Sequence, residues 1–280
     1  SLLFGIFSLN LIKNSEIISK FKILWEKQII NNLSQYKIER SKISAELIFD
    51  KPYLQLLTFS LSALRIINPN KINLLIEKNM DIYPNNIKKL LLKTGSLNGK
   101  PGSGNFAMFY AILLIGNNDK KQIIEWVNSH FKNMNKNGFW GLNSNHLSFQ
   151  NGYHQYEIFK FLNTNINEET KTNTLKLILN CSDYKGHFAP YFGGGACYDY
   201  DAVFLLIFLH QNKFDKQIKD VLVRLRDSII SEQNDDGGFC ENKYIRPLRL
   251  SAHISKIFSS KSISIFYERL IQFIFLVRPK

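Results

Sequence analysis

The sequence has little that would cross-link the chain or hold it in a membrane. Its 280 residues include only three cysteines, Cys181, Cys197 and Cys240, and no two of them form a CxxC pair. This count argues against a disulfide framework and predicts a reducing compartment, the cytoplasm. The longest nearly unbroken apolar run, 106–115, is about half of what a membrane-spanning helix needs. We therefore predict no integral membrane segment.

The first residues also lack the features of a targeting peptide. Residues 1–14 have neither a basic start nor a small-residue cleavage site, so a signal peptide is not predicted. The first residue is Ser1 and not a methionine. We therefore expect a truncated N-terminus.

Positive charge is abundant but scattered. Lysine and arginine total 36 against 23 acidic residues, a net charge of +13, and 28 of the 36 are lysines. Lysine doublets occur only at 88–89 and 120–121, and no basic helix is interleaved with aromatic residues. Nucleic-acid binding is therefore not predicted. A basic opening that attracts a diphosphate or an acidic sugar stays open as an alternative.

Strand signals are nearly absent, whereas apolar residues recur at helical spacing. Leu54, Leu57, Leu61 and Leu64 follow Pro52, a residue favoured in the first turn of a helix. Similar stripes occur later in the chain, and we expect all of them to face the core of an all-α protein. They are Phe214, Ile218, Val221, Leu222, Leu225 and Ile229, and Ile263, Phe266, Leu270, Phe273, Ile274 and Val277.

A glycine-aromatic turn recurs along the chain. Its copies are 138–141, 186–188 and 237–239, whose phenylalanines are 49 and 51 residues apart, and a weaker copy lies at 95–97. A period near fifty predicts repeated αα-hairpins, each of which needs a neighbour to bury its apolar face. The repeats are clearest over 95–260 and less certain over 1–94. We expect a single domain over 1–280.

The third turn carries a family resemblance. Its residues Gln233-Asn234-Asp235-Asp236-Gly237-Gly238-Phe239 resemble the glutamine-to-aromatic repeat motif of the terpenoid cyclases and protein prenyltransferases. The resemblance implies an α/α toroid, a barrel of αα-hairpins around a central cavity. It also implies an isoprenoid or lipid-like substrate in that cavity.

Chemically capable side chains gather at one register after these turns. They lie between 9 and 15 residues past the phenylalanine of each turn, where equivalent repeats would point them into one cavity. The set is His154, Cys197, Asp199, Asp201 and His253.

One reading of this set is a zinc site. Cys197, Asp199 and His253 supply a thiolate, a carboxylate and an imidazole, the ligand types of catalytic zinc. The protein prenyltransferases that this chain resembles hold zinc with an Asp, a Cys two residues later and a His. Here the order of the first two is reversed. Because residues two apart on one helix do not face each other, this reading requires Cys197 to lie in the loop before the helix.

The other reading is acid-base catalysis by Asp199, Asp201 and His154. The run Asp199-Tyr200-Asp201-Ala202 is similar to the acid motif of class II terpene cyclases, in which a protonated carboxylic acid donates to an alkene or epoxide, although Ala202 replaces the final Asp. Such a carboxylate pair equally suits a sugar-cleaving α/α barrel. Either aspartate alternatively caps a helix.

Aromatic residues and glycines surround the same register and form the predicted substrate-binding set. Glycines before Cys197 suit a close ligand approach or a phosphate nest, and tyrosines suit a prenyl pocket. The set is Tyr153, Tyr191, Tyr198, Gly194, Gly195 and Asn105.

These observations leave more than one class of function. The leading hypothesis is a prenyltransferase or cyclase acting in the central cavity, with zinc as the one cofactor suggested. The alternatives are a noncatalytic toroid scaffold or binding subunit with a helical partner, and a carbohydrate-active α/α barrel. The remaining histidines, His130, His146 and His210, are predicted to be structural or exposed.

Overall fold

The chain is helical wherever it is described. The computed structural model describes residues 2–141, 145–191, 196–233, 235 and 250–277, without the side chains of 250, 252, 253, 276 and 277. Within these residues there are 13 α-helices and no β-strand, and helix makes up 77% of the structure. The all-α prediction is confirmed for the described part of the chain.

The helices belong to two compact units, which are described separately. The first comprises residues 1–96 and 105–132, and the second comprises 97–104 and 133–280. The single domain and closed ring expected from the sequence stay predictions.

The first unit packs around a helix that the sequence predicted well. In α3 (Lys51–Ile67), all four leucines of the predicted stripe are buried. Asp50 caps this helix by accepting the Tyr53 amide, and its carboxylate also binds Arg40 of α2 at 2.6 Å. α1 and α2 both pack on α3. The bounds are α1 (Leu2–Leu11), α2 (Ser15–Ser41), α4 (Ile72–Glu77), α5 (Ile87–Thr94), α6 (Ser103–Gly116) and α7 (Lys120–Asn133).

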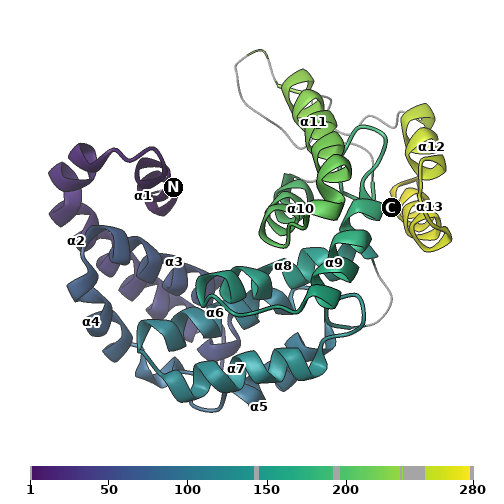
Figure 1. Cartoon of the computed structure of the whole chain (residues 1–280). Coiled ribbons are helices and arrows are strands. Elements are labelled where there is room, and N and C mark those ends of the chain that lie inside the picture. The colour runs from purple at the N-terminus through teal and green to yellow at the C-terminus, as the bar shows by residue number, and fades with distance from the viewer. Residues whose placement is uncertain (1, 142–144, 192–195, 234, 236–249, 278–280) are drawn as a thin grey trace. The chain divides into compact units, whose positions relative to one another are not determined.

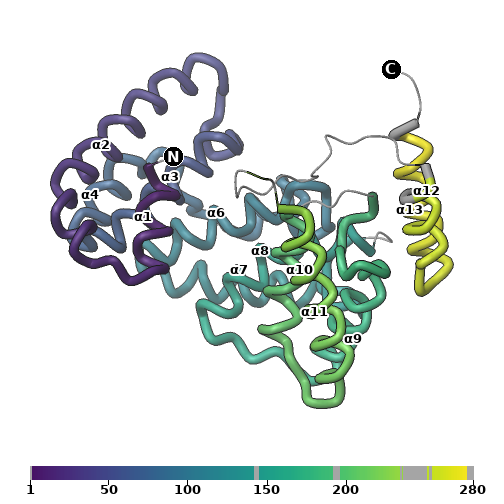
Figure 2. The backbone as a smooth tube through the Cα atoms, turned by 90° about the horizontal axis from the view of Figure 1, so that it is seen from above, coloured from purple at the N-terminus to yellow at the C-terminus, as the bar shows by residue number. Residues whose placement is uncertain are grey.

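The second unit consists of helix pairs (Figures 1 and 2). α8 (Asn145–Phe161) packs against α9 (Glu168–Cys181) and α10 (Ala196–Phe208), and α11 (Asp215–Ser231) packs against α9. α12 (Leu250–Phe258) and α13 (Ile263–Val277) form a further pair. The candidate site residues lie mainly on α8 and α10.

Two of the glycine-aromatic turns have the same hydrogen bonds. In the first, the Asn135 amide donates to the Phe139 carbonyl, and the Asn135 side-chain oxygen accepts the Phe139 amide at 3.1 Å. In the second, Asp183 does the same with His187, whose amide lies 2.9 Å from the Asp183 carboxylate. The third turn, 237–239, lies outside the described residues.

This hydrogen-bond pattern sets a register that differs from the alignment on phenylalanine. It makes His187 the equivalent of Phe139, at a spacing of 48 residues, whereas the aromatic alignment paired Phe139 with Phe188. The turn is defined by its backbone hydrogen bonds and its glycine. An alignment on the phenylalanines is therefore one residue out of register with the structure. In the new register, Asn151 is the equivalent of Asp199.

The glycine of each turn is required by its conformation and its surroundings. Gly138 and Gly186 have φ values of +80° and +93°, which side-chain-bearing residues rarely adopt. A Cβ on Gly138 would clash with the Thr174 hydroxyl on α9. A Cβ on Gly186 would lie 2.6 Å from the Leu225 amide nitrogen on α11. Each turn therefore fits directly against a helix of its repeat.

The predicted core stripes are confirmed only in part. In α11, Ile218, Val221 and Leu225 are buried as expected, whereas Ile229, near the end of the helix, is exposed. In α13 the expectation was wrong for Ile263 and Ile274, which are exposed, while Ile265 and Arg269 are buried. Glu268 and Arg269 of α13 make contacts inside the unit, and Ile263 and Ile274 lie on the exposed side of the helix.

No described helix has both the length and the hydropathy that crossing a membrane requires. The prediction of no integral membrane segment is consistent with this finding. The predicted cytoplasmic location stays a prediction.

Gly186→Ala is expected to destabilise the protein by about 2 kcal/mol or more, because it adds backbone strain and a clash with the backbone of α11. Gly5→Ala is the control: nothing lies within 4 Å of its added Cβ, and Ala is favoured over Gly in a helix by about 1 kcal/mol. Urea unfolding followed by circular dichroism measures both. Equal stability of the two variants would contradict the role assigned to Gly186.

Candidate functional site

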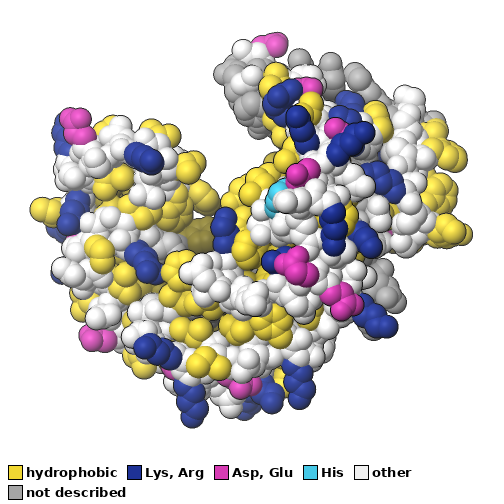
Figure 3. Space-filling model, in the orientation of Figure 1, with side chains coloured by type: hydrophobic (Ala, Val, Ile, Leu, Met, Phe, Trp, Pro, Cys, Tyr) yellow, Lys and Arg dark blue, Asp and Glu magenta, His cyan; other side chains and the backbone are white. Residues whose placement is uncertain are grey.

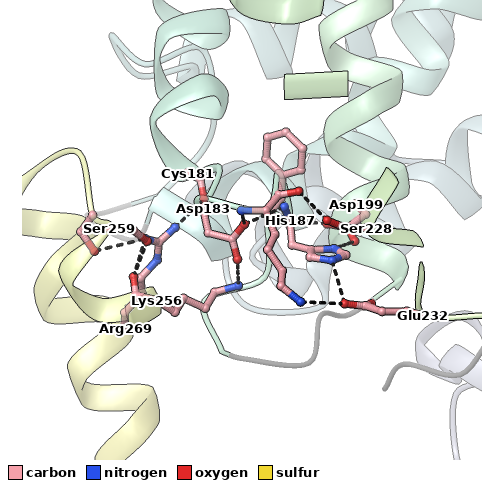
Figure 4. Close-up of polar contacts among 12 residues, drawn as sticks. Cys181, Asp183, His187, Asp199, Ser228, Glu232, Lys256, Ser259 and Arg269 are labelled. Atoms are coloured by element: carbon pink, nitrogen blue, oxygen red, sulfur yellow. Dashed lines mark hydrogen bonds and ion pairs between the residues drawn. The ribbon is translucent and has the colours of Figure 1, made fainter. Parts of the chain in front are cut away.

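A buried charged network surrounds the second turn (Figure 4). The His187 Nδ1 lies 2.7 Å from an Asp199 oxygen, and its Nε2 lies 3.4 Å from Glu232 at the end of α11. Burial lowers the pKa of His187, but the carboxylates of Asp199, Glu232 and Asp183 together outweigh it and raise this pKa to about 9. The imidazole is therefore positively charged at neutral pH and ties the turn to α10 and α11.

A second buried ion pair attaches α12 to the same turn. The Lys256 ammonium lies 2.8 Å from the Asp183 carboxylate, and both side chains are almost inaccessible. Burial raises the pKa of Asp183, but Lys256 and His187 oppose it and hold this pKa below its usual value. Arg269 of α13 donates to the backbone carbonyls of Lys256 and Cys181. We call Asp183, His187, Asp199, Glu232, Lys256 and Arg269 the charged turn network.

One of the predicted catalytic residues, Asp199, belongs to this network. One oxygen of Asp199 accepts the His187 ring nitrogen, and the other accepts the Phe188 amide at 2.7 Å. Asp199 is 7% exposed. The structure therefore places Asp199 as a positioning residue of the turn. Its catalytic role stays a prediction that these contacts do not favour.

The predicted zinc ligands do not come together in the described residues. Cys197 lies within the first turn of α10, and not in a loop before it, and is exposed, whereas Asp199 is buried and engaged. No group of three or more His, Cys, Asp or Glu side chains that could hold a metal occurs in the described ranges. The side chain of His253 lies outside them. The zinc site stays a prediction, which the engagement of Asp199 by the turn does not favour.

A second cluster forms where α8 and α10 pack together. Asp201 is buried on α10 and faces the charge of Glu157 on α8. His154 lies one turn before Glu157, with its Nδ1 3.5 Å from the Glu157 carboxylate. We call Asp201, Glu157 and His154 the acid cluster. Asp201 and His154 were predicted as catalytic from the sequence, and Glu157 was not.

The acid cluster keeps one carboxyl group neutral. Burial, with a further contribution from the negative charge of Glu157, raises the pKa of Asp201 to about 8. At neutral pH Asp201 therefore holds a proton that it can donate. The side chains of Glu157 and His154 are 31% and 20% exposed, so the cluster reaches solvent on one side.

Aromatic rings adjoin the acid cluster. Tyr153 contacts Tyr200 and Phe204 edge to face, at centroid distances of 5.7 and 5.2 Å, and it contacts His154 at 5.0 Å. Burial and the nearby Glu157 raise the pKa of Tyr153, so this phenol stays protonated. Tyr200 is 62% exposed. These faces could contact an apolar or cationic group beside Asp201.

The other predicted substrate-binding residues lie elsewhere or outside the described residues. Tyr198 is buried and packs on Tyr191 and Phe149, as a core residue does. Asn105 belongs to the first unit, at the start of α6. Gly194 and Gly195 lie outside the described residues. Of the members of this set that the structure describes in the second unit, Tyr153 contacts His154 of the acid cluster, and Tyr198 interacts electrostatically with Asp201.

The predictions for the remaining histidines fit the structure. His130 and His146 are buried; the first bonds the Trp126 carbonyl, and the second lies 2.5 Å from a Glu268 oxygen. His210 is exposed and pairs with Asp215. Cys181 is fully buried, as expected of a small core residue.

Several functional residues were missed at the sequence level. Glu157 follows His154 by three residues, a spacing that places both on one helical face and could have revealed it. His187 lies inside the repeated turn motif, next to Phe188, and only the phenylalanine was used to align the repeats. No sequence spacing links Glu232 or Lys256 to the turn, because Glu232, at the end of α11, and Lys256, on α12, are both remote from it in sequence.

No family model, curated protein or solved structure matches the chain. The resemblance to terpenoid cyclases and prenyltransferases therefore rests on the sequence motif alone.

The stability of the second unit is expected to depend on pH through His187. A folded-state pKa raised from 6.5 to about 9 stabilises the fold below pH 6.5, and this contribution is lost as the pH rises through about 9. The expected loss is on the order of 3 kcal/mol. Urea unfolding at a series of pH values measures it.

The matched control is the double variant His187→Phe/Asp199→Asn, which introduces the residues of the first repeat, Phe139 and Asn151. It lacks the titrating pair and should lose this pH dependence. The same pH dependence in both proteins would exclude His187 as its source.

Proposed function

We propose that this chain is an acid-base enzyme in which Asp201 donates a proton to an isoprenoid or other lipid-like substrate. The observation that carries the proposal is a buried, protonated carboxyl group beside a second carboxylate at a partly exposed aromatic rim. A general acid needs a proton to give near the working pH, and the pKa of Asp201, about 8, meets this condition.

The proposed step moves one proton. The O–H bond of Asp201 breaks as the proton adds to an alkene carbon or an epoxide oxygen, and the substrate becomes cationic. The rings of Tyr153, Tyr200 and Phe204, which contact one another next to His154, would supply the faces that stabilise that cation. After ring closure, the Asp201 carboxylate or Glu157 accepts a proton from the product. The cyclase reading, and not metal-dependent prenyl transfer, is therefore the one that the acid cluster supports.

A carbohydrate-active enzyme is the alternative at the same site. Asp201 and Glu157 form an acid and a carboxylate of the kind that cleaves glycosidic bonds. The aromatic side chains next to them favour an apolar substrate but also suit sugar rings. The two readings differ in the substrate that is turned over.

A noncatalytic binding subunit is the other alternative. It is favoured by a different observation, the exposed apolar side chains of α13, which are Ile263, Tyr267, Ile271, Ile274 and Phe275. A binding role for α13 and catalysis at α8 and α10 do not exclude each other.

Asp201→Asn is expected to lower turnover by about 10²–10⁴-fold, because it removes the proton donor while keeping the shape of the side chain. Activity of the wild type should also fall as the pH rises through about 8. The assay incubates the chain with an acyclic polyprenyl alkene, its terminal epoxide or a prenyl diphosphate in detergent, and detects cyclic products by mass spectrometry. Asp215→Asn, an exposed carboxyl on α11, is the matched control.

Full activity of Asp201→Asn would exclude Asp201 as the acid. Hydrolysis of aryl glycosides in place of cyclisation would instead support the carbohydrate-active alternative. No turnover in either assay would favour the binding subunit.

A further inference from the structure

A polar cavity of about 370 Å³ lies in the second unit. Four segments line it: the first glycine-aromatic turn, with Lys136 and Asn137, one face of α9, and the starts of α8 and α13. On α9 the polar lining residues are three or four apart, which places Asn173, Lys176 and Asn180 on that face. None of the lining residues belongs to the acid cluster or to the charged turn network.

Two lysines of this cavity lack a counter-ion. Figure 3 shows lysine and arginine side chains scattered over the visible surface with acidic side chains between them, so an exposed lysine alone does not mark a site. Lys136 and Lys176 are distinct because neither ammonium makes an ion pair or hydrogen bond with the described residues. No aspartate or glutamate is among the described residues that line the cavity. Its two positive charges are therefore not neutralised by the part of the chain that the structure describes.

The walls of the cavity are already joined to one another. The Asn173 side-chain amide donates to the Lys136 carbonyl at 3.0 Å, which ties α9 to the turn. The Asn145 side-chain amide donates to the Ser264 hydroxyl at 3.1 Å, which ties α8 to α13. Glu268 accepts the backbone and side-chain amides of Asn145, at 2.5 and 3.0 Å, so this carboxylate is used at the start of α8. Walls that are fixed before a ligand arrives lower the cost of binding it.

We propose that the polar cavity binds the phosphate group of a small phosphate monoester, such as a sugar phosphate. A phosphate monoester carries a charge of about −1.5 to −2 at neutral pH, which matches the ammonium groups of Lys136 and Lys176. The asparagine and serine side chains can both donate to and accept from sugar hydroxyls. Leu177 and Ile265, both buried, supply an apolar floor for the carbon face of a sugar.

The size and the charge pattern of the cavity favour a small ligand. Its volume is within the range of small-molecule sites, roughly 300–1,000 Å³. A nucleic acid would need a longer row of cations than the two lysines that line it. This inference does not depend on the catalytic role of Asp201, because the two sites share no residue.

Isothermal titration calorimetry of the full chain with glucose 6-phosphate, inorganic phosphate and glucose tests the proposal. Glucose 6-phosphate should bind saturably and more tightly than inorganic phosphate, and glucose should not bind. Lys176→Gln and, separately, Lys136→Gln should each weaken binding about tenfold or more, because each removes a charged donor. Lys216→Gln, at an exposed lysine of α11 outside the cavity, is the matched control and should bind like the wild type.

Asp201→Asn should also bind glucose 6-phosphate like the wild type, which separates this site from the catalytic proposal. Circular dichroism checks that each variant is folded. The absence of saturable binding up to millimolar glucose 6-phosphate would overturn the proposal, and so would equal affinities of Lys176→Gln and Lys216→Gln. Binding of inorganic phosphate as tight as that of glucose 6-phosphate would overturn the assignment to an ester.

Discussion

A buried imidazolium, that of His187, is the constraint on which the second unit depends. A positive charge in the interior is tolerated only when opposite charges are fixed beside it. Asp199 and Glu232 meet this need, and each comes from a different helix. A second buried ion pair, between Asp183 and Lys256, attaches α12 to the same turn. These charges therefore connect the turn to three helices, α10, α11 and α12, and removing one of them would leave its buried partner unpaired.

The first repeat reaches the same turn geometry without these charges. Asn135, Phe139 and Asn151 stand where the second repeat has Asp183, His187 and Asp199. The backbone bonds and the left-handed glycine are common to both turns. The charged residues are thus an addition to a turn that folds without them, and what they add is attachment to α11 and α12.

The two aspartates of α10 divide between structure and chemistry. Asp199 completes the charged turn network, whereas Asp201, two residues later, faces Glu157 on α8. Because residues two apart on a helix point in different directions, one helix can serve both purposes. The two carboxyl groups of the acid motif therefore have different partners, and Asp201 is the one to which our proposal gives the role of acid.

Helices and their buried stripes were predictable because local periodicity sets them, as in α3. The register of the turns was not, since it follows from backbone hydrogen bonds and not from the aromatic residue. In α13, Ile263 and Ile274 were predicted to be buried and are exposed, and the buried positions include Arg269, which finds its partners remote in sequence. The candidates His154, Tyr153 and Asp201 could be proposed from their register in the sequence, whereas Glu157 and the partners of His187 depend on tertiary contacts.

The protonation state of Asp201 tests the central claim most directly, because it needs no substrate. Carbon-13 NMR of the aspartate carboxyl groups, with Asp201→Asn to assign the signal, follows its titration. The account predicts a midpoint near pH 8, which falls when Glu157 is replaced by Gln. A midpoint near the ordinary value of 3.8 would contradict it.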